Sequence, residues 1–139
     1  MDRTLVQNVA RLVGIVFLLV GIAGFIPGVT TNLYDGLEFA GNDGTAELLG
    51  LFQVSVLHNI VHLLFGLAGL ALAATPSGAR TYLVGGGAIY LVLALLGIVS
   101  GGDWIPVNDA DNWLHLLLGA GMIGLGVLTT RESRVASTA

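Results

Sequence analysis

The chain has 139 residues, of which 55% are hydrophobic and 10% are charged, with a formal net charge of −4 and no cysteine. A soluble domain of this size would need more polar surface, whereas a protein embedded in lipid would not. The missing cysteine excludes disulfides and thiolate chemistry, and the lack of any basic run argues against nucleic acid as a partner.

The charged residues separate four long uncharged stretches, residues 12–34, 48–79, 81–102 and 112–130. Each stretch can hold the roughly 20 apolar residues that cross a bilayer as a helix. We therefore predict an all-α protein, a bundle of four transmembrane helices that forms one integral membrane domain over residues 1–139. The helices are expected at about residues 8–26, 53–74, 80–99 and 112–130.

Turn-forming residues set the connections between these helices. Pro27 and Gly28 should end the first helix, and a long outer loop should follow at about 28–47. The segment 75–78 (Thr-Pro-Ser-Gly) predicts a compact turn, so the second and third helices should be antiparallel neighbours. A second outer loop is expected at about 100–111.

The positions of the basic residues predict the topology. They occur near the N-terminus, in the connection between the second and third helices, and in the C-terminal tail: Arg3, Arg11, Arg80, Arg131 and Arg134. The two other connections carry acidic residues and no Lys or Arg. Because basic residues mark cytoplasmic segments, we predict a plasma-membrane protein with both termini cytoplasmic and both acidic loops outside.

An internal repeat is expected from two pairs of similar segments. The first and third helices share glycines at both ends, 14–24 and 87–97, with an aromatic residue at Phe17 and Tyr90. The second and fourth helices share Asn-x-x-His-Leu-Leu-x-Gly, at 59–66 and 112–119. Such self-similarity predicts two tandem helical hairpins related by an axis along the membrane normal.

The repeat brings the three histidines and one aspartate into one predicted site. His58 and His62 are four residues apart on one helix face, and Asp111 and His115 are spaced in the same way. Ionisable groups in a membrane usually mark function, and the helix rise places these within about the outer third of the bilayer. Three imidazoles and a carboxylate could bind Zn²⁺, Fe²⁺, Mn²⁺ or Cu²⁺. Asn59 and Asn112 are candidates for orienting the imidazoles.

Other interpretations remain open at this point. The same residues could form a structural or proton-relaying polar network without a metal. Haem ligated by histidines is disfavoured because it leaves Asp111 unexplained, and a quinone-binding redox component is a further alternative. The protein could also be an accessory subunit of a membrane complex or a homo-oligomer. The sequence lacks a nucleophile elbow, a phosphate-binding loop and an HExxH motif, so an enzyme is not favoured.

The segments 57–66 and 109–119 resemble an uncharacterised family of four-helix bacterial membrane proteins, largely actinobacterial and described as a domain of unknown function. The family is distantly similar to DoxX-like four-helix proteins. The resemblance covers nearly the whole chain, and its motifs on the second and fourth helices are the most specific. It implies a four-helix bundle in the membrane and no particular activity.

Overall fold

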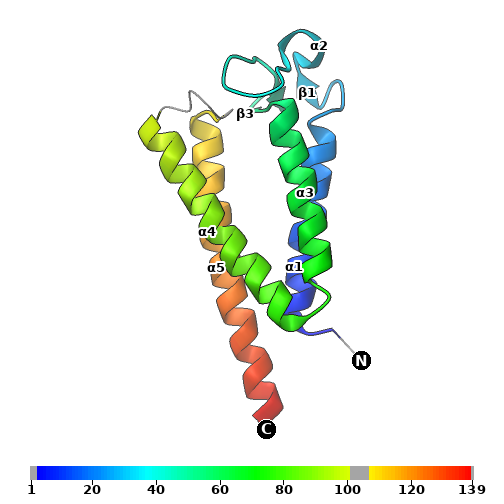
Figure 1. Cartoon of the computed structure of the whole chain (residues 1–139), viewed down its shortest axis with the longest axis vertical. Helices are drawn as coiled ribbons and strands as arrows, with labels where there is room; N and C mark the ends of the chain where they lie inside the picture. Colours follow the sequence, from blue (N-terminus) through cyan, green and yellow to red (C-terminus); the bar gives the residue numbers. More distant parts are fainter. Residues whose placement is uncertain (1–2, 101–106, 139) are drawn as a thin grey trace.

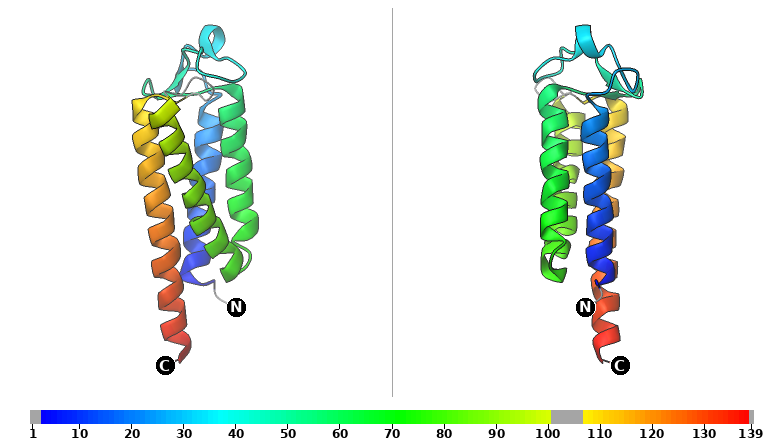
Figure 2. Two further views of the ribbon diagram at one scale, coloured as in Figure 1. Left: turned by 60° about the vertical axis from the view of Figure 1, so that its left-hand side comes forward. Right: turned by 90° about the vertical axis from the view of Figure 1, so that its right-hand side faces the viewer.

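The computed structural model describes residues 3–100 and 107–138, and this part of the chain is mostly helical (Figure 1). Its long helices are α1 (Leu5–Ala23), α3 (Val56–Leu72), α4 (Pro76–Ser100) and α5 (Asp109–Thr138). α1 packs mainly along α3, and α4 packs mainly along α5. The molecule is therefore built from two helix pairs, with both chain ends at one end and a small sheet at the other (Figure 2).

Among the described residues, three helices are long and apolar enough to cross a membrane: α1, α4 over Pro76–Val99, and α5 over Asp109–Thr129. α3 is apolar but has 17 residues. It spans about 25 Å, slightly less than the hydrocarbon core of about 30 Å. Large apolar side chains on all four helices are more than half exposed, among them Leu12, Leu19, Leu64, Leu95 and Leu117. Apolar surface of this extent indicates contact with a lipid bilayer.

α3 begins at Val56, three residues later than predicted, because Ser55 caps it. The Ser55 hydroxyl accepts a hydrogen bond from the backbone N–H of His58 at 3.1 Å, which satisfies one of the free donors of the first turn. The residues before the cap, Phe52 and Gln53, form a strand instead. α5 begins at Asp109, three residues earlier than predicted. There the Asn108 side chain accepts from the Asp111 N–H at 3.0 Å.

The prediction of a compact turn over residues 75–78 was wrong, because α4 already begins at Pro76. Proline suits the first helical position, since its φ is fixed near the helical value and its missing N–H would be unpaired there. The Thr75 hydroxyl accepts from the Gly78 N–H at 3.0 Å and acts as the cap. Only Ala73 to Thr75 separate α3 from α4, so the two helices are consecutive and antiparallel (Figure 1).

The predicted outer loop at 28–47 is folded into a small cap. It contains β1 (Thr30–Thr31), the short helix α2 (Leu33–Gly36) and β2 (Glu47–Leu48), and β3 (Phe52–Gln53) completes an antiparallel sheet in the order β1-β2-β3. Ala46, Leu48 and Val54, in or beside these strands, are buried and pack with Val20 and Ala23 of α1. Strands of two residues leave no alternating pattern, so the sequence could not predict them. Of the second predicted loop, residues 101–106 lie outside the described residues, and residues 109–111 are helical.

Facing glycines bring the helices of each pair close together. A Cβ atom added to Gly14 would lie 2.9 Å from the carbonyl oxygen of Gly66, and one added to Gly87 would lie 2.7 Å from that of Gly119. Both distances are shorter than a side-chain carbon tolerates. These positions therefore require glycine for the observed packing of α1 on α3 and of α4 on α5.

Candidate metal centre

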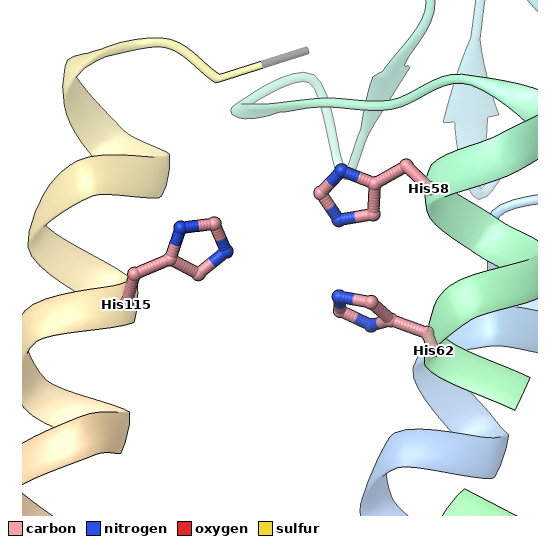
Figure 3. Close-up of side chains that lie close together, drawn as sticks. All are labelled: His58, His62 and His115. Carbon is pink, nitrogen blue, oxygen red and sulfur yellow. The ribbon is translucent and has the colours of Figure 1, made fainter. Parts of the chain in front are cut away.

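The caps of α3 and α5 place the three histidines at the sheet end of the molecule. His58 and His62 lie in the first two turns of α3, and His115 lies in the second turn of α5. All three side chains point into the space between the two helix pairs (Figure 3). The predicted convergence of histidines from these two helices is thus present in the structure.

The three imidazoles are close enough to share one ion. One ring nitrogen from each histidine lies within 4.8 Å of the others. The ring centroids of His58 and His62 are 4.5 Å apart, and those of His58 and His115 are 6.3 Å apart. Nitrogens around a tetrahedral Zn²⁺ are about 3.3 Å apart, because each Zn–N bond is about 2.0–2.1 Å. Small side-chain rotations would therefore bring the three nitrogens to bonding distance.

Two of these imidazoles are buried with an unused polar atom. His62 is 7% exposed and His115 is 4% exposed, and the Nδ1 atom of each has no hydrogen-bond partner within residues 3–100 and 107–138. Leaving a buried polar atom unpaired costs about 1–3 kcal/mol. A metal ion that accepts a nitrogen lone pair would remove part of this cost.

Aromatic side chains hold the buried histidines in matching ways. The ring of Phe17 meets that of His62 edge-on at 5.4 Å, and the ring of Tyr90 meets that of His115 edge-on at 5.2 Å. Phe17 and Tyr90 also contact each other, with centroids 5.3 Å apart. Sequence reasoning noted this aromatic pair as part of the repeat but did not assign it to the site.

The structure places Asp111 beside the histidines but outside the group that shares the 4.8 Å spacing. Its Oδ2 atom accepts hydrogen bonds from the backbone N–H of Gln53 at 2.9 Å and of Asn108 at 3.1 Å. The carboxylate thus joins β3 to the start of α5. The sequence analysis did not include Gln53 in the site. Its contact with Asp111 depends on strand β3, which is too short to be recognised from the sequence.

The two asparagines predicted to orient imidazoles have other neighbours. The Asn59 side-chain amide donates to the carbonyl oxygen of Gly24 at 2.9 Å, a contact between α3 and the end of α1. The Asn112 side chain lies against Gly97, and its buried Oδ1 has no hydrogen-bond partner in the part of the chain that the structure describes. Each asparagine therefore lies against a glycine of the other helix in its pair: Asn59 against Gly24 at the end of α1, and Asn112 against Gly97 in α4.

Two small cavities reach the histidines. A cavity of about 180 Å³ lies between α3 and α4 and is lined by all three imidazoles and by Tyr90. A second, of about 120 Å³, lies on the opposite side, where Phe52, Asp111 and the same three histidines line it. An ion held by the histidines would therefore keep room for further ligands on either side.

Comparison with known proteins identifies one family. Searches of the curated proteins and of the solved structures found no match. The family model DUF4383, a domain of unknown function, matches residues 7–128 and so covers both helix pairs and the histidine cluster. This confirms the predicted membership of an uncharacterised family, whereas the actinobacterial origin and the DoxX-like relationship stay predictions. The chain belongs to the DUF4383 family.

Proposed function

We propose that this protein is a small integral membrane protein that binds a divalent transition-metal ion through His58, His62 and His115. The observation that carries the proposal is the convergence of three ring nitrogens within 4.8 Å, from two helices far apart in sequence. Imidazole suits Zn²⁺, Cu²⁺ and Fe²⁺, and three protein ligands leave a coordination position open. Asp111 supports the site by joining the sheet to α5 rather than as a primary ligand.

The unpaired atoms favour a metal over a purely structural polar network. In a network, each buried polar atom would be expected to find a partner, yet Nδ1 of both His62 and His115 lacks one among the described residues. The size of the cavities also disfavours haem. Those that reach the histidines measure about 180 and 120 Å³. Pockets for drug-sized ligands begin at about 300 Å³.

An internal duplication accounts for the symmetry of the site. The facing glycines Gly14 and Gly66 correspond in the predicted repeat to Gly87 and Gly119. The contacts Phe17–His62 and Tyr90–His115 correspond in the same register. The same correspondence relates the helix cap Ser55 to the cap Asn108. It also relates the contact Asn59–Gly24 to the contact Asn112–Gly97. Four kinds of contact repeated with one register support two related helical hairpins.

The proposed membrane arrangement has four spans with both termini in the cytoplasm. Three helices are long enough to span the bilayer. The shorter α3 can also span it if the capping sheet lies at the membrane surface and the bilayer thins locally around the helix. The arginine-bearing segments all lie at the end of the molecule opposite the sheet, which agrees with the positive-inside rule (Figure 2). In this arrangement the histidines lie near the outer surface of the plasma membrane.

Metal content tests the proposed site. The protein is purified in mild detergent, incubated with Zn²⁺, passed through a desalting column and measured by elemental analysis. We expect one Zn²⁺ per chain in the wild type and substoichiometric Zn²⁺ in His62→Ala and His115→Ala, because each substitution removes one of the three protein ligands. Leu117→Ala, on the exposed face of α5, is the matched control and should bind like the wild type.

The proposal fails if the folded wild type retains no stoichiometric Zn²⁺, Cu²⁺ or Fe²⁺, or if both histidine variants retain as much as the wild type. Circular dichroism of each variant shows that the helices are intact. Retention by His62→Ala and His115→Ala would place any bound ion elsewhere in the chain.

A further inference from the structure

The cavity between α3 and α4 combines a polar floor with apolar walls. The three histidines form one side of it, and Leu57, Val61, Leu93 and Val107 are among the residues that form the rest. Ala40 and Gly41, from the segment between α2 and β2, line it at the sheet end. Such a combination is typical of a site that orients an apolar molecule through one polar group.

The size of this cavity matches a single aromatic ring. It measures about 180 Å³, and an apolar cavity of about 150 Å³ is known to accept benzene. The planar rings of Tyr90, His62 and His115 line it, and aromatic rings pack favourably edge to face against one another. A ring-shaped ligand therefore fits both the volume and the walls.

Access to the cavity is from the side of the helices. Leu57 is 44% exposed and Val61 is 47% exposed, so the α3 wall of the cavity continues onto the outer surface of this helix. α3 and α4 are joined at the opposite end and diverge towards the sheet (Figure 1). In a bilayer this side faces lipid, and a molecule dissolved in lipid could reach the histidines without crossing the sheet.

We propose that this cavity binds a lipid-soluble phenol, with its ring in the cavity, its oxygen on the open coordination position of the metal, and its aliphatic chain leaving past Leu57 and Val61 into the bilayer. The inference rests on the proposed metal site. A neutral phenol partitions into lipid, and its oxygen is a metal donor. A fatty acid is a poorer fit, because its flexible chain has no flat ring to pack against the aromatic walls of the cavity.

Cobalt spectroscopy tests the inference. The full chain is placed in nanodiscs of neutral lipid and loaded with Co²⁺, whose visible absorption bands report the ligands around the ion. The probes are 4-hexylphenol and hexylbenzene, which share ring and chain and differ in the oxygen. We expect saturable changes in the Co²⁺ bands with 4-hexylphenol and none with hexylbenzene.

A second experiment fills the cavity by substitution and leaves all three histidines in place. Val61→Trp fills it from the α3 wall, and Leu57→Trp does so from one turn earlier, which provides a second variant if the first does not fold. Each should retain the Co²⁺ bands and bind 4-hexylphenol at least about tenfold more weakly, equivalent to about 1.4 kcal/mol. Leu64→Trp, at a 60% exposed position of α3 outside the cavity, should respond like the wild type.

The outcomes separate the two proposals. Absence of Co²⁺ bands in the wild type overturns the metal site and the phenol site together. Normal Co²⁺ bands that do not respond to 4-hexylphenol, or that respond equally to hexylbenzene, overturn the phenol site alone. An undiminished response in both folded Trp variants also overturns it, because the phenol would then bind outside this cavity.

Discussion

Two glycines of α4 that are separated by a single residue, Gly85 and Gly87, have opposite surroundings. At Gly85, an added Cβ atom would meet no described residue within 4 Å. At Gly87 it would lie 2.7 Å from the Gly119 carbonyl oxygen and 2.8 Å from the Ile123 side chain. The run of three glycines at 85–87 therefore does not have a single role. Gly87 permits the close approach of α5, and Gly85 is an unfavourable helix residue on an exposed surface.

We expect Gly87→Ala to destabilise the protein by about 1–3 kcal/mol, because the new methyl group must push α5 away. Gly85→Ala should stabilise it by about 0.5–1 kcal/mol, because alanine loses less conformational entropy in a helix. Thermal unfolding in detergent, followed by circular dichroism, measures both. Equal effects of the two substitutions would contradict the close contact between α4 and α5.

At the residue scale, the sequence predicted which histidines converge but not how their neighbours are arranged. The four-residue spacing of His58 and His62 and the repeated motif around His115 were sufficient, because helical geometry fixes which side chains share a face. Asp111 has the same spacing from His115, yet its carboxylate turns to backbone donors. Those donors belong partly to β3, which the sequence could not predict.

Among the elements, the capping sheet and α5 are joined through one side chain. Asp111 accepts from Gln53 in β3 and from Asn108 at the start of α5, so removing its carboxylate leaves two backbone donors without this partner. We expect Asp111→Ala to cost about 1–3 kcal/mol. Asp111→Asn should cost less because it keeps one acceptor oxygen. Hydrogen exchange at the Gln53 amide, together with thermal unfolding, measures the loss.

Asp109→Ala is the control for this prediction. Asp109 lies in the same first turn of α5 but is exposed, so its loss should remove only a small favourable interaction with the helix dipole, about 0.3–1 kcal/mol. If Asp111→Ala and Asp109→Ala have the same effect on unfolding and on the Gln53 amide, the contact between sheet and helix carries no stability.

The helix ends show which elements a sequence predicts well. The apolar stretches placed all four long helices, because about 20 uncharged residues have few alternatives in lipid. The starts of all four differ from the prediction by three or four residues, and Thr4, Ser55, Thr75 and Asn108 precede them as caps. α1 also ends at Ala23, three residues before its predicted end. Ser55 and Thr75 lie inside one uncharged stretch, and Asn108 lies four residues before another, so hydropathy alone could not show where these helices begin.

For the whole molecule, the cysteine-free chain allows a direct test of topology. Single cysteines are introduced at Asp43, in the cap, and at Ser77, at the start of α4, both exposed positions at opposite ends of the molecule (Figure 1). With both termini in the cytoplasm, a membrane-impermeant maleimide should label Asp43→Cys in intact cells and Ser77→Cys only after permeabilisation. Labelling of Ser77→Cys alone in intact cells would reverse the proposed orientation.

The histidine cluster has one further consequence for the molecule as a whole. His58 and His62 belong to the helix pair α1–α3, and His115 belongs to α4–α5, while only Ala73 to Thr75 link the pairs along the chain. An ion bound by all three histidines would connect the two helix pairs, each of which has most of its contacts within the pair. Metal binding and the packing of the two halves against each other would then be one linked equilibrium, so bound metal would make their separation less favourable.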